Sequence, residues 1–492
     1  MLKNIHDRIH STFDYKWIVL TVTTIGTLMA AIDSTIVILG LPDMMASLHA
    51  DLIQMVWVIM GYFLVSTVFL LILGRVADLF GRVRLYNLGF VVFTFGSALC
   101  GFAGNAPLLI AFRLLQGVGA AMMVVNSVAI ITEAFPPNER GTALGINAIT
   151  FAAGGVLGPV LGGFILTVSD WHWLFFINIP IGLVGTVWGY IILKELAIKK
   201  RETMDFAGAL FFSIGLVSLL LALTLGIDLT FTSPPIIALF ALFFIFLAIF
   251  IWWERHHAYP LLDFSLFRHR VYTFSVLSAM AQSLALYAVN FLIVFYLMGV
   301  RGYDALTAAF LLIPLPLMIS VMAPIAGRIS DRIGARIPAT VGLVIQAVAL
   351  ALLAFLTTAT PYWQIAVALG LLGLGGGLFF PPNTSAAMNS SPKERLGVAS
   401  GTLATLRQVG IVTSFALSLA VAAESLPHDV MMRLFVGTNV QLGSAIASEF
   451  VIGMRSAFYV SVVLCLVAAV LSMMRGEEDR GRHAVPVQDR QQ

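Results

Sequence analysis

The sequence predicts an all-α membrane protein of fourteen transmembrane helices arranged as two similar halves, and three observations lead to this fold class. First, the chain has 492 residues, of which 59% are hydrophobic and only 11% are charged. A soluble domain has too little interior to hide that much apolar surface. Second, the apolar residues gather in runs of roughly 20 residues, the length that a helix needs to cross a bilayer. Third, short motifs in the first half of the chain recur in the second half.

The apolar runs are separated by polar connections, and we count fourteen of them. They cover residues 17–40, 53–73, 84–103, 107–132, 142–166, 173–193, 206–226, 235–253, 272–298, 305–326, 337–358, 362–387, 398–424 and 452–474. A secretory signal has a shorter apolar core that ends at a small-residue cleavage site. The first run is long enough to span a bilayer, so we expect it to be retained as the first transmembrane helix.

The basic residues indicate which side of the membrane the two ends face. Of the 28 lysines and arginines, Arg113 and Arg407 fall inside runs, and Arg301, Arg433 and Arg455 are assigned to the side opposite the termini. The other 23 fall at the termini or in loops on the same side as the termini. By the positive-inside rule, both termini are expected in the cytoplasm and the protein in the inner or plasma membrane.

An internal repeat joins the two halves of the chain. The segment GRVADLFGRVR at 74–84 is echoed by GRISDRIGAR at 327–336. Three pairs share a separation of 253 positions: Gly74 with Gly327, Asp78 with Asp331, and Gly81 with Gly334. A second echo places Arg140 and Arg395 255 positions apart. Two six-helix halves with two additional helices between them account for both offsets, and repeated halves are a common transporter plan.

This repeat predicts five segments along the chain. They are a cytoplasmic N-terminus at 1–16, an N-terminal six-helix half at 17–193, a linker with two additional helices at 194–271, a C-terminal six-helix half at 272–474 and a polar, disordered cytoplasmic tail at 475–492. The tail is rich in charged residues and glutamine, a composition that cannot bury enough apolar surface to fold.

Several motifs resemble those of a known family, the major facilitator superfamily. GRVADLFGRVR resembles its loop between the second and third helices, RLLQGVGAA (113–121) its fourth-helix motif, and GGVLGPVLGG (154–163) the fifth-helix motif of its drug antiporters. The fourteen-helix drug:proton antiporter branch has motifs similar to IDSTIVILGLP (32–42), WHWLFFINIP (171–180), ERHHAYPLLDFSLFR (254–268), LRQVG (406–410) and GMRSAFYV (453–460). The resemblance covers essentially the whole chain.

The resemblance implies a transporter that exports drugs or other lipophilic or cationic compounds by alternating access. It implies a proton gradient as the driving force, no cofactor, a monomeric protein in the lipid bilayer, and protons and a small molecule as its ligands. A periplasmic adaptor is a candidate partner. Two positions depart from the pattern: Ile38 stands where asparagine is frequent, and His172 where arginine is common. Because Ile38 removes a polar contact near Asp33, the substrate range is not carried over.

Asp33 is a carboxylate inside the first apolar run, and Arg113 is its expected partner. Asp33 lies ~10 Å from the outer end of its helix, and Arg113 ~9 Å from the same membrane face, at 1.5 Å per residue. A charge at the centre of a membrane helix costs about 2.5–3.5 kcal/mol on insertion scales, so such groups face the protein interior and pair. Burial favours the protonated acid, whereas a nearby guanidinium favours the carboxylate. The resemblance implies proton coupling for both residues; the alternative is a permanent ion pair that only locks two helices.

Three further groups of residues are candidates for function. For a substrate cavity they are Tyr62, Asn126, Asn147, Gln282, Tyr287, Asn290, Gln346 and Arg407, with interhelical hydrogen bonds or packing as the alternative. For a conformational latch, as the family implies, they are Gly74, Asp78, Gly81 and Arg82 with Gly327, Asp331 and Gly334, with a tight polar turn as the alternative. Gly154, Gly158, Pro159, Gly162 and Gly163 form a small-residue face that favours close helix packing; the family implies a seal and pivot between the halves.

Other function classes are disfavoured by the sequence. It contains neither H-E-x-x-H nor G-x-S-x-G, so we do not expect an enzyme. No basic tract suggests nucleic acid, and no cluster suggests a metal site. A dedicated exporter of one physiological lipid or metabolite remains an alternative to a drug exporter. Asp33 is the only acid deep in a run, and an acid-poor cavity favours neutral or anionic cargo.

Overall fold

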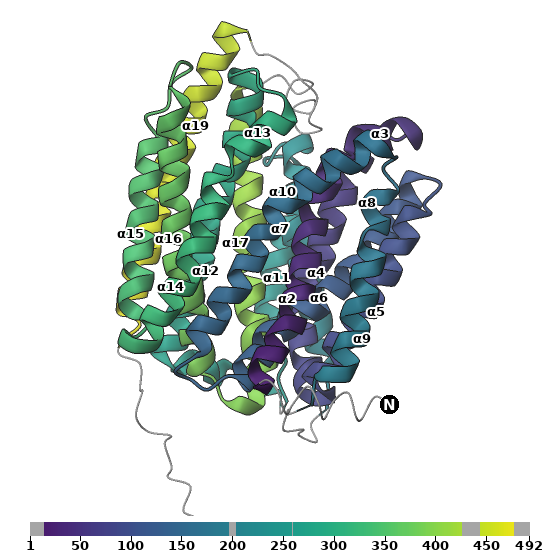
Figure 1. Cartoon of the computed structure of the whole chain (residues 1–492), viewed down its shortest axis with the longest axis vertical. Helices are drawn as coiled ribbons and strands as arrows, with labels where there is room; N and C mark the ends of the chain where they lie inside the picture. Colours follow the sequence, from purple (N-terminus) through teal and green to yellow (C-terminus); the bar gives the residue numbers. More distant parts are fainter. Residues whose placement is uncertain (1–13, 196–202, 258, 426–442, 477–492) are drawn as a thin grey trace, which may run out of the picture.

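A computed structural model describes residues 14–195, 203–257, 259–425 and 443–476, and every regular element in these ranges is a helix. Figure 1 shows two bundles of long helices side by side, coloured purple to blue and green to yellow. The N-terminal bundle contains α2 (Tyr15–Leu39), α3 (Leu41–Ser47), α4 (Leu52–Phe80), α5 (Arg82–Gly101), α6 (Ala106–Ala134), α7 (Arg140–Val168), α8 (Trp173–Phe176) and α9 (Asn178–Ile192).

The C-terminal bundle follows a pair of linker helices, α10 (Phe206–Leu229) and α11 (Pro234–His256). Its elements are α12 (Arg270–Phe295), the π-helical turn η2 (Tyr296–Val300), α13 (Ala305–Leu311), α14 (Pro314–Ile333), α15 (Arg336–Leu353), α16 (Tyr362–Asn389), α17 (Leu396–Ser425) and α19 (Ser444–Met474). Short 3₁₀ turns, η1 (Phe264–Arg268) and η3 (Lys393–Arg395), precede α12 and α17.

Twelve helices in the described ranges are long and apolar enough to cross a membrane, two fewer than the sequence predicts. They leave out α12 and α17, although these helices have 26 and 30 residues. The all-helical membrane architecture is therefore present, while the number fourteen and the domain boundaries at 194 and 272 stay predictions.

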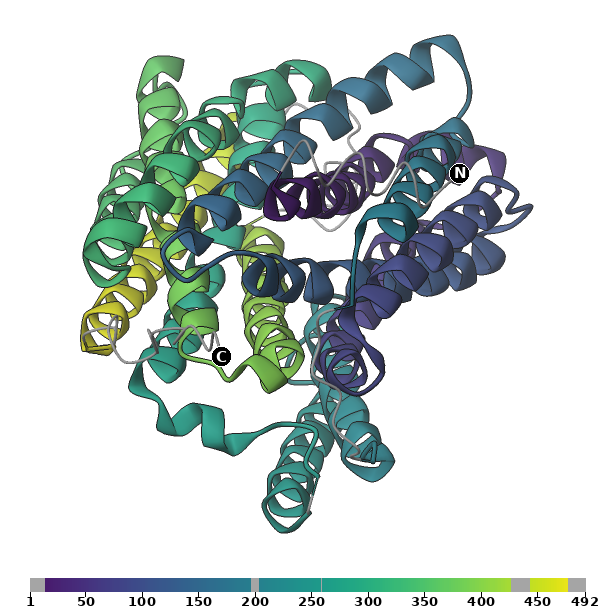
Figure 2. The same cartoon turned by 60° about the horizontal axis from the view of Figure 1, so that its bottom comes forward.

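The linker helices lie outside the two bundles. In Figure 2, α10 and α11 form a teal hairpin that points away from the rest of the molecule. Trp253 of α11 donates its indole N–H to Asp205, which caps α10, at 2.9 Å. The face of α10 around Leu216 and Leu220 packs against α4 and α17. The hairpin is thus attached beside the place where the two bundles meet.

The repeated motifs lie in helices rather than in turns, which corrects one sequence-based expectation. Gly74 and Asp78 belong to the last turns of α4, and the corresponding Gly327 and Asp331 belong to α14. Each helix ends at the last glycine of the motif, where Gly81 and Gly334 have φ angles of 115° and 94°. A glycine with positive φ ends a helix without the steric cost that other residues incur.

Two arginines of the C-terminal segment bond to oxygens outside α19. Arg455, which the sequence assigns to the side of the membrane opposite the termini, lies in α19 and donates its Nε–H to the Ala354 carbonyl at 2.9 Å. Arg475, expected at the start of a solvated tail, is fully buried and donates to Asn383 Oδ1 at 2.6 Å. Long side chains reach backbone and amide oxygens that satisfy their charge. Residues 477–492 of the expected tail lie outside the described ranges.

Candidate functional site

Asp33 and Arg113 form a buried ion pair in the N-terminal bundle. The Arg113 Nη1 lies 2.7 Å from Asp33 Oδ2, and the two residues are 1% and 0% exposed. Their helices α2 and α6 place them at the same depth, as expected from their positions in the two apolar runs. A charge-assisted bond of this length, shielded from water, is among the stronger polar contacts in a protein.

Two amide side chains complete the surroundings of Asp33. Gln116 Nε2 and Asn178 Nδ2 each donate to the same oxygen, Asp33 Oδ1, at 2.9 Å. Both amides are fully buried, Gln116 on α6 and Asn178 at the first position of α9. Three side-chain donors, from Arg113, Gln116 and Asn178, therefore converge on the one carboxyl group of Asp33.

Arg113 is fixed by several groups besides Asp33. Its Nη1 also donates to Gln116 Oε1 at 2.8 Å, and its Nε donates to the Val58 carbonyl of α4 at 3.2 Å. The guanidinium carbon lies 4.3 Å from the centre of the Tyr62 ring, within the range of a cation–π contact. Tyr62, a sequence candidate for the substrate cavity, therefore supports the ion pair.

All of these groups come from helices of one bundle. Asn178 also donates to Ser97 Oγ of α5 at 3.0 Å, and Ser97 donates to the Phe175 carbonyl at 2.9 Å. The site therefore joins α2, α4, α5, α6, α8 and α9, and its polar side chains are shielded from solvent. Asp33 faces the interior and pairs with Arg113, as the sequence predicts, and the site is enclosed within the N-terminal half.

A second set of sequence candidates lies where the bundles meet. Asp78 Oδ1 accepts a hydrogen bond from the Gly397 N–H at 2.8 Å, and its Oδ2 accepts one from the Val398 N–H at 2.9 Å. Gly397 and Val398 begin α17 of the opposite bundle. A helix N-terminus has unpaired N–H groups and a positive dipole end, both of which favour a carboxylate.

Asp331 makes the equivalent contact in the other direction. Its Oδ1 and Oδ2 accept from the backbone N–H groups of Gly141 and Thr142, both at 2.9 Å, and the Thr142 hydroxyl donates to Oδ2 at 2.7 Å. These residues begin α7 of the N-terminal bundle. We call the two contacts together, Asp78 on α17 and Asp331 on α7, the bundle seam.

Glycines let the helices approach closely at the bundle seam. A Cβ added to Gly74 would lie 2.4 Å from the Gly397 carbonyl oxygen, and one added to Gly327 would lie 2.2 Å from the Gly141 carbonyl oxygen. Contacts this short with backbone atoms require the helices to move apart. The repeated glycines thus have a packing reason in both copies of the motif.

Arg82 strengthens only one of the two contacts. Its guanidinium lies 2.7 Å from Asp78 and 3.3 Å from Glu133, and it donates to the Lys393 carbonyl at 2.7 Å. The position 253 residues later is Ala335, which has no charge. The seam is therefore symmetric in its backbone contacts and asymmetric in its ion pairs.

The small-residue face of α7 packs within its own bundle. Added Cβ atoms at Gly154, Gly158 and Gly162 would contact Ala31, Thr35 and Ile36 of α2, respectively. The sequence-based expectation that this face lies between the halves is therefore wrong. The face instead brings α7 against the helix that carries Asp33. Pro159 and Gly163 are half-buried beside it.

Most of the polar cavity candidates bond to neighbouring helices. Gln282 of α12 donates to Gln346 of α15 at 3.4 Å, and Gln346 donates to the Leu372 carbonyl of α16 at 3.3 Å. Asn147 of α7 donates to Thr27 of α2 at 3.1 Å. Asn126 donates to the Met122 carbonyl of its own helix at 2.7 Å. The side chains of Tyr287 and Asn290 lie outside the described part of the chain.

Arg407 differs from these residues because it is charged and half-buried. It lies seven residues, or two helical turns, after Ser400 on α17, so both residues share a helix face. Ser400 donates to the Val125 carbonyl of α6 at 3.0 Å, across the bundles. Within the part of the chain that the structure describes, the Arg407 guanidinium has no hydrogen-bond or ion-pair partner.

The sequence analysis missed several residues of both sites. Gln116 and Asn178 lie within the motifs RLLQGVGAA and WHWLFFINIP, and each is a polar residue in an apolar run. That signal was available, since polar groups buried in membrane helices need partners. The backbone donors of Gly397 and Gly141 carry no such signal, because their contacts depend on how the bundles are arranged.

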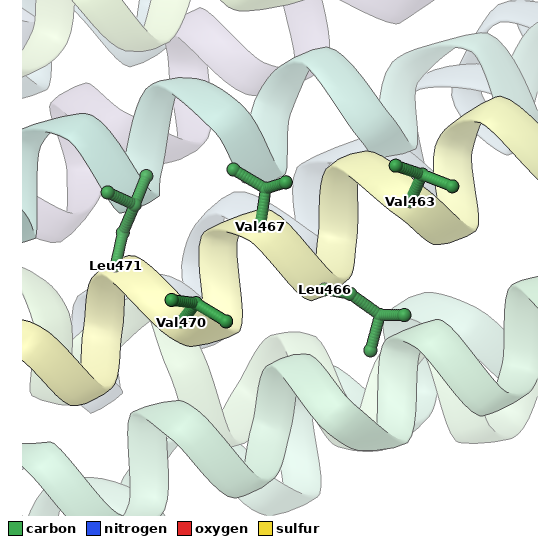
Figure 3. A pocket seen from close by; sticks show the side chains of 5 residues that line it. All are labelled: Val463, Leu466, Val467, Val470 and Leu471. Carbon is green, nitrogen blue, oxygen red and sulfur yellow. The ribbon is translucent and has the colours of Figure 1, made fainter.

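A hollow of about 300 Å³ on α19 is lined only by Val463, Leu466, Val467, Val470 and Leu471 (Figure 3). These side chains carry no polar group, and they suit lipid tails rather than a polar ligand. No group of three or more histidine, cysteine, aspartate or glutamate side chains in the described ranges is arranged to hold a metal ion.

Comparison with known proteins identifies the family. A family model described as the Major Facilitator Superfamily matches residues 23–415. The chain belongs to this superfamily. Superfamily membership and the transporters it resembles make this protein a membrane transporter rather than an enzyme.

Relatives within the superfamily include a riboflavin transporter and a multidrug resistance protein. The chain is 31% identical to the riboflavin transporter RibZ of Clostridioides difficile over 93% of this chain and 97% of the relative. It is also 31% identical to the multidrug resistance protein Stp of Mycobacterium tuberculosis, over 82% of this chain and 75% of the relative. The solved structure of the proton:xylose symporter XylE matches with a TM-score of 0.66 at 13% identity, covering 93% and 95% of the two chains, which shows the shared fold.

Proposed function

We propose that this superfamily member is a proton-coupled exporter of lipophilic compounds and that Asp33 carries the proton. The observation that supports this proposal is the sealed site in which one carboxylate accepts from Arg113, Gln116 and Asn178. A structural ion pair needs one partner. Three donors from two helices instead make the geometry of the N-terminal bundle depend on whether Asp33 is ionised.

Protonation of Asp33 would change the balance of charge inside the bundle. The neutral acid attracts Arg113 less strongly, and a guanidinium without a counter-ion is costly in a low-dielectric interior. Rearrangement of α2 and α6 relieves that cost. The glycines of α7 pack on α2, and the start of α7 contacts Asp331 at the bundle seam. A movement of α2 would therefore shift α7 and change the contact at the seam.

The arrangement of the chain in the membrane is part of the same proposal. We infer fourteen spans, with α12 and α17 added to the twelve apolar helices, and the fourteen-helix drug:proton antiporter branch as the closer relationship. With both termini in the cytoplasm, the bundle seam lies on the cytoplasmic side, so the described conformation is closed there. The proton gradient then supplies about 2.3 kcal/mol per charge for each 100 mV of membrane potential.

Arg407 supports a second candidate function, the export of one acidic or neutral metabolite. It is half-buried on the α17 face that meets the opposite bundle, and its guanidinium has no partner among the described residues. An anionic group on the cargo would neutralise it, whereas a cationic cargo would be repelled. The riboflavin transporter among the relatives makes a single metabolite a reasonable alternative to a range of drugs.

The experiment compares wild type with Asp33→Asn in inside-out vesicles that have an acidic interior. A pH-sensitive dye reports proton release when lipophilic cations, neutral lipophiles or organic acids are added. We expect release with the wild type and none with Asp33→Asn. Asp43→Asn is the matched control, because Asp43 is an exposed carboxylate of the same bundle. Equal release from wild type and Asp33→Asn would refute the role of Asp33.

A further inference from the structure

The two amides that donate to Asp33 differ in what holds their carbonyl oxygens. Gln116 Oε1 accepts from Arg113 at 2.8 Å and contacts the Cys100 thiol at 3.7 Å. Asn178 Oδ1 is buried and has no hydrogen-bond partner among the described residues. The Gln116 side chain is therefore fixed in one orientation, whereas the Asn178 side chain has nothing that holds its oxygen.

A buried carbonyl without a partner is uncommon and needs a reason. Leaving such an acceptor unsatisfied costs about 1–3 kcal/mol. Asn178 lies next to Ile177, where α8 and α9 are joined, so its position is set by the backbone and not by a mobile loop. The chain thus keeps a polar atom in a costly environment directly beside its buried acid.

Rotation of the Asn178 amide by half a turn exchanges its two polar groups. The Nδ2 that now lies 2.9 Å from Asp33 Oδ1 and 3.0 Å from Ser97 Oγ would be replaced by the carbonyl oxygen. Beside a carboxylate this orientation places two acceptors together and is unfavourable. Beside a protonated acid it provides an acceptor for the acid O–H. The Ser97 hydroxyl suits both orientations, since it can donate or accept.

We propose that Asn178 binds both protonation states of Asp33, donating its N–H to the carboxylate and, after rotation, accepting the O–H of the acid. This inference rests on the proposed role of Asp33 as the proton carrier. In the step itself, a hydronium ion transfers its proton to Asp33 Oδ1: one O–H bond of the hydronium breaks, one O–H bond forms on the carboxyl group, and a water molecule is released. The N–H···O bond from Asn178 is replaced by an O–H···O bond to its carbonyl, and no other covalent bond changes.

Gln116 has a different part in this step. Its Nε2 continues to donate to Asp33 Oδ1, because the oxygen of a protonated carboxyl still has a lone pair to accept with. Its carbonyl stays with Arg113. Gln116 therefore positions Asp33 in both states, whereas Asn178 changes its orientation with the proton. Because Asn178 begins α9, the protonation state is transmitted directly to the junction of α8 and α9.

The test is an infrared difference spectrum of the purified full-length protein between neutral and acidic pH. A protonated carboxylic acid has its own C=O band, and an amide C=O band moves to lower frequency when the oxygen gains a hydrogen bond. We expect an acid band that is lost in Asp33→Asn. We also expect a paired amide signal that is lost in Asn178→Leu and moves when asparagine side chains carry ¹³C.

Asn87→Leu is the matched control. Asn87 of α5 is a buried asparagine whose Oδ1 also lacks a hydrogen-bond partner among the described residues. It lies near Gly189 and Val22, about three turns of α2 away from Asp33. The paired amide signal should persist in this variant. The isotope shift in the wild-type protein tests the same proposal if Asn178→Leu does not fold.

The possible outcomes separate this inference from the proposed function. If no acid band depends on Asp33, the proton-carrier role fails, and the inference fails with it. If the acid band is present but no asparagine signal accompanies it, Asp33 takes up the proton without help from Asn178. In that case the inference is overturned while the proposed function stands. A signal that persists in Asn178→Leu would also overturn it.

Discussion

Asp78 and Asp331 make the same contact in opposite directions across the two bundles. Each carboxylate accepts hydrogen bonds from two successive backbone N–H groups at the start of a helix in the other bundle, at 2.8–2.9 Å. The two acids are 253 positions apart, and the helix starts they contact, at Gly141 and Gly397, are 256 apart. The internal repeat of the sequence thus becomes a two-fold contact between repeats.

The first prediction concerns the strength of the bundle seam. Asp78→Asn or Asp331→Asn removes a carboxylate that accepts two backbone hydrogen bonds, and bonds to charged groups contribute about 1.5–3 kcal/mol each. We expect each variant to open the seam at least tenfold more often. A cysteine at Ser400, which is buried between α17 and α6, reports opening through its maleimide labelling rate. Unchanged labelling would mean that packing alone closes the seam.

The second prediction concerns the close approach of the helices at the seam. Gly327→Ala would place a methyl group 2.2 Å from the Gly141 carbonyl oxygen and force α14 away from α7. We expect labelling of the cysteine at Ser400 to rise and transport to fall. Gly155→Ala is the control, because an added Cβ at Gly155 meets nothing within 4 Å. Equal behaviour of the two variants would contradict the tight seam.

The third prediction concerns the packing of α7 on α2. Gly158→Ala would bring a methyl group 3.1 Å from the Ile32 carbonyl oxygen and into the Thr35 side chain. Overpacking of this kind costs about 1–3 kcal/mol, so the melting temperature in detergent should fall. Gly155→Ala, three residues away on the same helix, should be neutral or slightly stabilising, since alanine favours helix. A melting temperature of Gly158→Ala equal to wild type would refute the contact.

The fourth prediction concerns the energetic coupling of Asp33 and Arg113. Arg113→Leu leaves a buried carboxylate without its counter-ion, and breaking such a pair costs about 3–5 kcal/mol. Asp33→Asn combined with Arg113→Leu should destabilise the protein less than the sum of the single changes. Unfolding of the four proteins in detergent gives the coupling energy. Additive effects would mean that the two charges do not depend on each other.

The fifth prediction concerns the charge of the cargo. Arg407→Gln keeps a polar side chain and removes a charge that has no partner among the described residues. We expect the export of organic acids to fall at least tenfold while neutral lipophiles are affected little. The measurement is proton release from inside-out vesicles for the two classes of compound. Loss of both classes to the same extent would indicate that Arg407 holds the helix rather than the cargo.

The sequence predicted those features that depend on one helix or on the repeat. Asp33 and Arg113 could be paired because depth in a membrane follows from counting residues along each helix. The glycines of the repeated motif were expected in a turn, and this was wrong. Gly74 and Gly327 lie in α4 and α14, because these helices continue to Gly81 and Gly334. Helix ends depend on local φ angles that composition does not reveal.

Features that depend on the rotation of a helix about its axis were not predictable. The glycines of α7 face α2 and not the opposite bundle, a choice that the spacing of small residues leaves open. In the same way, Gln116 and Asn178 could be recognised as buried amides, but their convergence on one oxygen required the orientation of α6 and α9. Periodicity defines a face, and tertiary packing decides what that face meets.

The enclosure of Asp33 within one bundle has a consequence for energy conversion. Its contacts come from the helices of the N-terminal bundle, whereas Arg407 lies on the face of α17 that meets that bundle from outside. A proton on Asp33 and a cargo molecule near Arg407 would therefore occupy separate compartments and never displace one another directly. The number of protons moved in each transport cycle would then be set by the N-terminal bundle alone and would not depend on the cargo. The net charge moved per cycle would vary with the cargo, so membrane voltage would drive some compounds more strongly than others.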